Sequence, residues 1–419
     1  MMSGSSSLPD VAFVCHAYHR GGVTRWMVDA AVAWRELGGR AWLLAPSPPG
    51  NGHASPRPSV IGLALDAENN VRPEIVTWRL DATFELGTAN HRAFTYAKVI
   101  EHHVPLGVPM ILSDDPAVWA GAAMLCARNP LVGVIHSDEA TYYGYVRHYR
   151  NELSGIVCVS RRTRDRVVQT LERPELPIET IPCGVPVSDE HPQPDRRPDG
   201  EPRIVWVGRM EESSKRVSDL PKIARALRDA SLPCRFDLIG DGPARAELAE
   251  NIARSDLSFS MTLHGWSDRD AVRSILENAD LFLLPSNFEG MSVSLMEALA
   301  SGCAVVSSST SGIEDYATHD GAARCVWTFP VGDVAAAVQC VCDALSVPRA
   351  ERQQRSLSFA RSEFSIERCV RAYASFVRRL RPPARDTGQA SRVIRAHLSA
   401  IASRPIAAWR SARLSRSMR

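Results

Sequence analysis

The sequence alternates short apolar segments, each long enough for one buried strand, with longer segments that have the spacing of amphipathic helices. The first unit runs from a strand at 11–14, through a glycine turn and a helix that ends near Leu37, to a strand at 41–45. This order is a βαβ unit, which requires parallel strands. Further strands are predicted at 110–112, 132–135 and 155–159. The first half of the chain is therefore predicted to be an open α/β domain.

The alternation stops between Pro186 and Pro202 and then starts again. This stretch is rich in proline and aspartate, a composition typical of a linker between domains. Beyond it, strands are predicted near 203–207, 235–239, 261–264, 280–284 and 303–307, with helices between them. Two open α/β domains bind ligands best at the carboxyl ends of their strands. A ligand site is therefore expected in the cleft between the two domains.

A chain of 419 residues is long enough for two domains that each have a core. We predict six segments: a disordered N-terminus (1–10), an N-terminal Rossmann-like domain (11–185), a linker (186–202), a C-terminal Rossmann-like domain (203–362), a helix (363–382) and a basic tail (383–419).

The composition indicates a soluble globular protein, because 45% of the residues are hydrophobic and 23% are charged. No apolar run reaches the roughly 18–20 residues that a membrane-spanning helix needs. The first ten residues lack the pattern of a secretory signal. The ten cysteines are scattered and form no Cys-x-x-Cys pair, which favours buried thiols over a metal site or disulfides. We therefore expect a cytoplasmic protein.

Two glutamates eight residues apart, Glu289 and Glu297, carry the strongest functional signal. An apolar strand at 279–284 leads into the loop that carries Glu289, Gly290 allows a turn, and a helix is expected to begin near Ser292. Free N–H groups at a helix N-terminus favour an anion. Glu297 lies about one and a half turns into that helix. Such a site suits a ligand with hydroxyls on both sides of a phosphate, as in a nucleotide sugar.

This stretch resembles the nucleotide-sugar motif of the retaining GT-B glycosyltransferases of glycosyltransferase family 4 (glycosyl transferases group 1). The resemblance covers roughly residues 11–380 and also includes the segments 181–185, 205–210, 239–243 and 264–266, in the order that the family shows. It implies the GT-B fold, an α/β architecture with a cleft between two Rossmann-like domains. By this resemblance, 11–185 is the acceptor domain, 203–362 is the nucleotide-sugar-binding domain, and 363–382 is a crossover helix that returns to the first domain.

The resemblance also assigns roles to individual residues. Arg209 and Lys215 are expected to contact the donor's diphosphate. The guanidinium of Arg209 offers several N–H donors in one plane, and the ammonium of Lys215 is a compact positive charge. Glu289 is expected to bind the transferred sugar, Glu297 the ribose, and His136 the sugar from across the cleft. The expected donor-binding backbone positions are Gly21, Gly22, Gly208, Gly290, Met291, Ser292 and Val293. The alternatives are surface ion pairs for Arg209 and Lys215, a plain turn at Gly21 and Gly22, and a structural role for His136.

The chain departs from the family at Ser292, where many members have a second glycine, which leaves the donor sugar undetermined. A formal Asp-x-Asp at Asp268-Arg269-Asp270 resembles a metal motif, but Ser267 and Asp270 favour a helix cap. No cofactor and no bound metal are therefore expected, and Arg209 with Lys215 would supply the positive charge.

The resemblance implies transfer of a sugar from a nucleoside diphosphate to a hydroxyl, with retention of anomeric configuration, in cell-envelope or exported glycan synthesis. Front-face attack needs no protein base, because the leaving phosphate takes the acceptor's proton. A non-catalytic GT-B scaffold, or another GT-B enzyme such as a nucleotide-sugar epimerase, is the alternative. Acceptor specificity is expected in loops around 46–60, 66–76 and 137–150.

The tail is strongly basic although the whole chain has a net charge of only +2. From Ala384 to Arg419 there are eight arginines and one acid. Arginines beside apolar residues at helical spacing are typical of helices on an anionic membrane surface, which a lipid-linked acceptor would make useful. A solvated extension is the alternative. A nucleic-acid partner is not expected.

Overall fold

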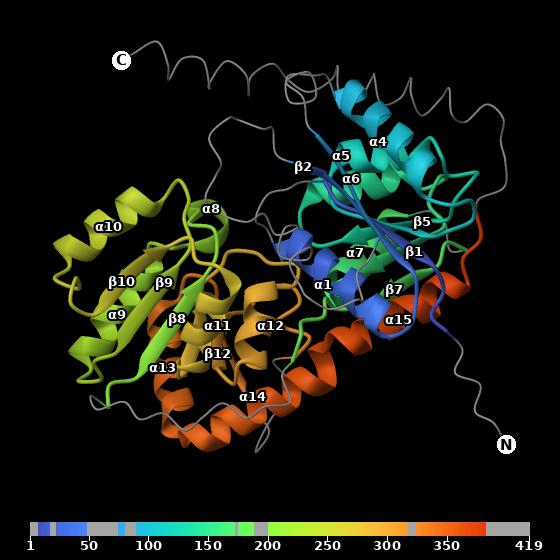
Figure 1. Cartoon of the computed structure of the whole chain (residues 1–419). Coiled ribbons are helices and arrows are strands. Elements are labelled where there is room, and N and C mark those ends of the chain that lie inside the picture. The colour runs from blue at the N-terminus through green and yellow to red at the C-terminus, as the bar shows by residue number, and fades with distance from the viewer. Residues whose placement is uncertain are drawn as a thin grey trace, which may run out of the picture.

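The computed structural model describes residues 7–16, 22–47, 74–79, 89–171, 175–187, 200–316 and 324–382, which form two lobes (Figure 1). Gly21, most of the predicted linker and the basic tail lie outside these residues, as do the first six residues and most of the loops expected at 46–60 and 66–76. Among the described residues, no helix is both long and apolar enough to cross a membrane.

The N-terminal lobe contains a seven-stranded parallel sheet in the order β3-β2-β1-β4-β5-β6-β7. Its strands are β1 (Val11–Val14), β2 (Ala41–Ser47), β3 (Glu74–Arg79), β4 (Met110–Leu112), β5 (Leu131–Ile135), β6 (Gly155–Cys158) and β7 (Ile178–Thr180). Its helices are α1 (Gly22–Glu36), α4 (Ala89–His103), α5 (Pro116–Ala123), α6 (Ala140–Tyr149) and α7 (Arg161–Thr170). Strands β1, β4, β5 and β6 are fully buried, which explains their continuous apolar sequences.

The C-terminal lobe contains a six-stranded parallel sheet in the order β10-β9-β8-β11-β12-β13. Its strands are β8 (Arg203–Val207), β9 (Arg235–Ile239), β10 (Met261–Gly265), β11 (Leu281–Leu284), β12 (Ala304–Ser308) and β13 (Val326–Phe329). Its helices are α8 (Glu212–Lys215), α9 (Asp219–Asp229), α10 (Arg245–Arg254), α11 (Arg269–Glu277), α12 (Val293–Ala300), α13 (Val334–Ser346) and α14 (Arg349–Phe364). The prediction of two parallel α/β sheets is confirmed.

Helix α15 (Ile366–Arg378) leaves the C-terminal lobe and packs on the N-terminal lobe, as predicted (Figure 1). Ser365, which caps it, pairs with Val185 in an isolated parallel bridge. Gly155 lets the helix approach β6 closely, because a Cβ there would lie 2.7 Å from the ring of Phe376. The first lobe is therefore completed by residues from the far end of the described chain.

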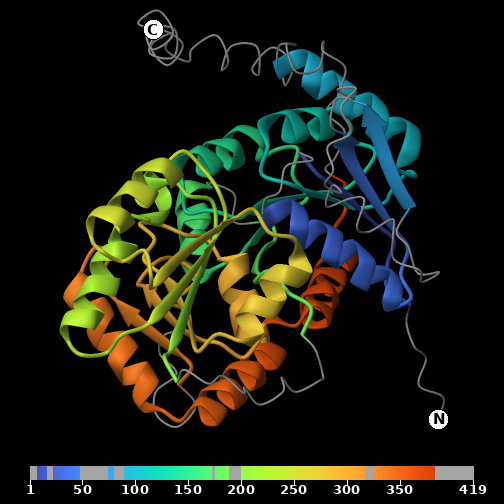
Figure 2. The same cartoon turned by 60° about the vertical axis from the view of Figure 1, so that its left-hand side comes forward.

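The two lobes share one apolar core. Buried residues of α1, the β1 and β8 sheets, α12 and α15 belong to a single hydrophobic cluster, while α4, α5 and α6 form a second cluster on the outer side of the first sheet. Figure 2 shows α1 (blue) lying between its own sheet and the second lobe, next to α15 (orange-red). Because α1 contacts both lobes, its N-terminus lies at the junction between them.

Each sheet has one point where the chain leaves in opposite directions, between β1 and β4 in the first lobe and between β8 and β11 in the second. At such a switch point the loops that follow the two strands diverge and leave a crevice, which is where open α/β sheets bind ligands. The fold therefore offers one crevice in each lobe.

Candidate active site

The crevice of the C-terminal lobe holds a buried ion pair. Lys215, at the end of α8, donates from Nζ to Glu289 Oε1 at 2.6 Å, and Ser286 Oγ donates to the same oxygen at 2.7 Å. Glu289 follows β11 and is only 8% exposed. A carboxylate buried to this degree needs such partners, because an isolated buried charge is strongly unfavourable. The structure thus brings together the cation and the acid that the sequence predicted.

Asn287 joins the two loops that carry this pair. Its backbone N–H donates to the carbonyl of Ser214 and its side-chain amide to that of Ser213, both at 2.8 Å. Arg216 donates back to the Asn287 side chain at 3.2 Å and ends α8 with a left-handed backbone, φ 47°. Lys215 is therefore fixed relative to Glu289 by three hydrogen bonds.

The loop after β8 passes against the loop after β9 without room for a side chain. Gly240 has φ +135°, and a Cβ there would lie 1.8 Å from the carbonyl oxygen of Gly208. Any other residue at position 240 would displace the backbone from which Arg209 and α8 continue. Gly208 thus has a packing role that holds whether or not it contacts a ligand.

Two helix N-termini, one from each lobe, meet beside the ion pair. Ser292 caps α12 by accepting from the N–H of Leu295, and a Cβ on Gly22, the first residue of α1, would lie 3.2 Å from Val293, the first residue of α12. The first N–H groups of a helix have no intrahelical acceptor and carry a partial positive charge. Two such ends and Lys215 together form a site for an anion.

A second pair of carboxylates lies deeper, between α1 and α12. The pKa of Glu297 is raised to about 7, first by burial and then by the charge of Asp29, while Arg25 acts to lower it. Burial likewise raises the pKa of Asp29 to about 6, although Arg25 Nε donates to it at 3.1 Å. Arg269 of the other lobe also contacts Asp29, at 3.3 Å. Glu297 therefore sits in a part of the site that disfavours a second negative charge.

His136 faces the Glu289 loop from the end of β5. A Cβ on Gly290 would lie 1.9 Å from the backbone oxygen of His136, so the two lobes are in contact there. The imidazole packs on Trp26 with ring centroids 5.1 Å apart, and Nδ1 lies 3.7 Å from the thiol of Cys183. Burial lowers the pKa of His136 to about 4, so the ring is neutral at physiological pH.

Arg209 is the predicted site residue that the structure does not bring to the pair. Its side chain is 67% exposed, and its guanidinium lies 3.9 Å from Glu211. Lys215 and Arg209 therefore do not converge in this structure. Contact between Arg209 and a diphosphate remains a prediction that requires the side chain to move.

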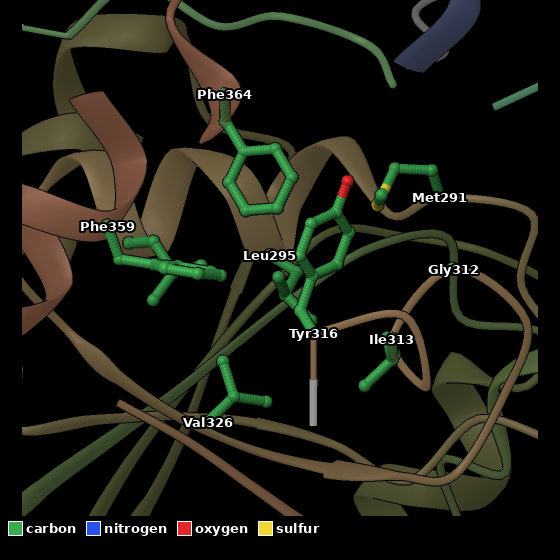
Figure 3. Close-up of a pocket in the computed structure, with 9 residues that line it drawn as sticks. Met291, Leu295, Gly312, Ile313, Tyr316, Val326, Phe359 and Phe364 are labelled. Atoms are coloured by element: carbon green, nitrogen blue, oxygen red, sulfur yellow. The ribbon is translucent and has the colours of Figure 1, made fainter. Parts of the chain in front are cut away.

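Met291 contributes its side chain to packing. It is 6% exposed and lines an apolar pocket behind α12 with Leu295, Tyr316 and Phe364 among others (Figure 3). The rings of Tyr316 and Phe364 lie 4.8 Å apart in an edge-to-face arrangement. Because the side chain of Met291 packs among these apolar side chains, only its backbone is available to a ligand.

The capping of α11 differs in detail from the prediction. The cap residue is Asp268, whose side chain accepts from the N–H of Ala271 at 2.9 Å, whereas Ser267 with Asp270 was the predicted arrangement. A single carboxylate oxygen reaches the third N–H of the helix, so Ser267 is not needed. Among the residues that the structure describes, no three His, Cys, Asp or Glu side chains gather as a metal ion would require. Independence of metal stays a prediction.

Sequence reasoning missed three residues of the site: Arg25, Asp29 and Asn287. Asn287 lies inside the glutamate motif, between an apolar strand and the helix that follows it, and asparagine is common in such loops because it favours turns. Arg25 and Asp29 lie four apart on α1, a spacing that ordinary surface ion pairs also show. Only the packing of α1 on the second lobe distinguishes them.

Two family models match the chain. The model for glycosyl transferases group 1 matches residues 201–346, and that for Glycosyltransferase Family 4 matches residues 20–189. Together they cover both lobes and include every predicted site residue.

Curated relatives match over part of their length. The amylovoran biosynthesis glycosyltransferase AmsK of Erwinia amylovora is 35% identical over 140 residues, 32% of this chain and 33% of AmsK. A GDP-mannose-dependent alpha-(1-6)-phosphatidylinositol dimannoside mannosyltransferase of Mycobacterium tuberculosis is 31% identical over 194 residues, 44% of this chain and 47% of its own length. The chain thus spans a third to a half of these relatives.

Solved structures share the fold over most of the chain. Anabaena HepE in complex with UDP and glucose superimposes with a TM-score of 0.70 at 17% identity, covering 88% of this chain and 99% of HepE. Staphylococcus aureus TarM superimposes with a TM-score of 0.69 at 12% identity, covering 90% and 100%. At these identities the likeness shows the fold alone. With its two lobes, its crossover helix and both family models matched, the chain belongs to the GT-B glycosyltransferases of family 4, the glycosyl transferases group 1.

Proposed function

We propose that the protein transfers a hexosyl group from a nucleoside-diphosphate sugar to a hydroxyl of a glycan or lipid-linked acceptor, with retention of anomeric configuration. The observation that carries the proposal is the meeting of two helix N-termini beside Lys215. Three sources of positive potential from both lobes suit a diphosphate, because its charge is spread over two phosphoryl groups. A single sugar ring would not need them.

The groups around this anion site fit the rest of a donor. Glu289 can accept from hydroxyls of the transferred sugar, and Glu297 from the ribose, since each is a carboxylate near the expected ligand. Neutral His136 can hydrogen-bond the sugar without repelling an oxocarbenium-like centre. As the bond to the diphosphate breaks, Lys215 and the helix N-termini stabilise the charge that develops on the leaving phosphate.

The relatives support an envelope or exported glycan as the product. One is named for amylovoran biosynthesis and another for a phosphatidylinositol mannoside, which are a polysaccharide and a glycolipid. The proposal therefore includes a cytoplasmic reaction at the inner face of a membrane. The predicted contact of the basic tail with anionic lipid is part of it.

The test is thermal stabilisation by a panel of UDP, GDP, ADP and their sugars. At a concentration of about 100 times the dissociation constant, a ligand of the native state adds about 2.7 kcal/mol. We expect one nucleotide class to stabilise the wild type and the control Glu250→Ala, an exposed glutamate of the same lobe. Arg209→Ala and Glu297→Ala are expected to lose this stabilisation.

A second measurement tests the reaction. The product formed from the stabilising sugar nucleotide is expected by NMR to keep the donor's anomeric configuration, with no requirement for added divalent metal. Inversion, or loss of activity with a chelator, would contradict the proposed mechanism. If no nucleotide stabilises the wild type, the donor site itself is wrong and a non-catalytic scaffold becomes the better description.

A further inference from the structure

The N-terminal lobe has a crevice of its own, at the switch point between β1 and β4. His16 follows β1 and Asp114 follows β4, and His16 Nδ1 lies 3.5 Å from Asp114 Oδ1 across the crevice. The hydroxyl of Tyr96 donates to the backbone oxygen of His16 at 3.0 Å and so holds the end of β1. The arrangement parallels Lys215 and Glu289, which flank the switch point of the other lobe.

Two adjacent aspartates follow β4, and the helix uses only one of them. Asp115 caps α5, accepting from the N–H groups of Ala117 and Val118 at 2.7 and 3.2 Å. Asp114 contributes nothing to that cap. Instead, Tyr142 donates its hydroxyl to Asp114 Oδ2 at 3.2 Å, which fixes the carboxylate.

The other oxygen of Asp114 is buried without a hydrogen-bond partner in the described part of the chain. Its distance from His16 is too long for a good hydrogen bond. An unpaired buried carboxylate oxygen costs free energy that a donor from a ligand would recover. The side chain as a whole is 13% exposed, so the crevice still admits one.

A second buried atom without a described partner lies at the next strand. His136 is 8% exposed, and its Nε2 has no hydrogen-bond partner within the described ranges. Burial lowers the pKa of His136, with Asp114 raising it and His16 lowering it, so the three side chains share one local environment. The ends of β1, β4 and β5 thus meet at one place, beside the Glu289 loop.

The other acidic groups near this crevice already have partners. Asp138 accepts from Tyr143 at 2.6 Å and pairs with Arg166 at 2.8 Å. Glu139 accepts from Ser137 at 2.9 Å. Asp114 is therefore the carboxylate of this group with a buried oxygen that remains for a ligand.

We propose that Asp114, held by Tyr142, binds and orients a hydroxyl of the acceptor, and that the receiving ring is uncharged or carries an amine. This inference rests on the proposed transferase function. A ring with a carboxylate or phosphate beside Asp114 would bring two negative charges together in a partly buried crevice, which is unfavourable. Asp114 positions the acceptor and takes no proton: the acceptor oxygen bonds to the anomeric carbon, the bond to the diphosphate breaks, and the proton goes to the leaving phosphate.

The test uses three monosaccharides with the same ring and different charge: glucose, glucosamine and glucuronate. Release of nucleoside diphosphate from the stabilising sugar nucleotide is measured with each one. For the wild type we expect glucose and glucosamine to raise the release above the rate of donor hydrolysis, and glucuronate to be at least about tenfold less effective.

Variants then separate the acceptor site from the donor site. Asp114→Asn is expected to lower kcat/KM for glucose about 10- to 100-fold, mainly through KM, and to reduce the preference over glucuronate. Tyr142→Phe should have a smaller effect in the same direction, because the carboxylate remains. Glu101→Gln, an exposed glutamate on α4, serves as the matched control with wild-type rates.

Nucleotide stabilisation distinguishes the possible failures. If no nucleotide stabilises the wild type, the proposed function fails and this inference fails with it. If a nucleotide stabilises both the wild type and Asp114→Asn, the donor site stands and any one of three results rejects only the assignment of Asp114. These results are equal use of glucuronate and glucose, an unchanged KM in Asp114→Asn, and no effect of any of the three sugars.

Discussion

Replacing Glu297 by glutamine should stabilise the ligand-free protein at neutral pH while weakening nucleotide binding. The carboxyl of Glu297 has its pKa raised from the ordinary value of 4.5 to about 7, through burial first and the nearby Asp29 second. The native state therefore holds this proton more tightly than the unfolded chain does. Between about pH 4.5 and pH 7 the native state binds more protons than the unfolded chain does, so the free energy of unfolding falls as the pH rises.

The magnitude follows from the same pKa values. Raising one carboxyl pKa from 4.5 to about 7 costs the ionised native state about 3 kcal/mol. Glu297 is only partly buried, so we take this as the ceiling. Glutamine resembles the protonated carboxyl in shape and keeps a neutral charge. Glu297→Gln should therefore equal the wild type near about pH 4.5 and exceed it by up to about 3 kcal/mol near pH 8.

Urea unfolding at a series of pH values measures this difference directly. Asp29, whose pKa is raised to about 6, contributes in the same direction, and because its charge acts on Glu297 the difference between the two proteins includes their mutual repulsion. Glu250→Gln is the matched control, and its pH profile should follow that of the wild type. Parallel profiles for wild type and Glu297→Gln would show that Glu297 is ionised without cost, and the reasoning about its surroundings would then be wrong.

Three further predictions concern packing and capping. Arg352 is 4% exposed and pairs with buried Asp280 at 3.0 Å. Arg352→Ala should therefore lower the free energy of unfolding by about 3–5 kcal/mol. A loss below about 1 kcal/mol in urea unfolding would contradict a buried pair. Gly290→Ala would place a Cβ 1.9 Å from the backbone oxygen of His136 and should separate the lobes. The rate of sugar transfer should then fall at least about tenfold, while nucleotide should still stabilise the protein. Full transfer activity in this variant would refute the contact. Ser292→Ala should cost about 1 kcal/mol and Ser292→Gly only a few tenths, since glycine is tolerated at a cap; equal losses in thermal unfolding would show that the hydroxyl is not a cap.

The fold could be predicted from the sequence because most of its strands are short apolar runs separated by helices of clear period. The apolar run 281–284 and the helix at 366–378 are examples, and both appear within four residues of the expected positions. Strand β13 was missed, because Val326–Phe329 is only four residues long and so short an apolar run has no diagnostic period. Strand β7 is only half-buried and short, so its pattern is weak.

The candidate site was predictable in part. The pair of Lys215 and Glu289 came from a resemblance that fixes both positions, and the structure places them in contact. The position of Asp114 could not be inferred in this way. It depends on which strands neighbour one another and on the choice of Asp115 as the cap, and both are properties of the packed sheet.

The crossover of α15 also constrains the order in which the protein can fold during synthesis. Tyr373 packs on Trp26 with ring centroids 5.5 Å apart, and Phe376 lies against Gly155, so the inner side of the first lobe is not fully covered until the last described helix is in place. The last strand of the first lobe ends at Thr180, so a ribosome makes about 180 more residues before it reaches α15 at Ile366. The nascent first lobe must therefore remain with an uncovered apolar face, available to chaperones, until the second lobe has been made. The two lobes thus complete folding together, although the N-terminal lobe is synthesised first.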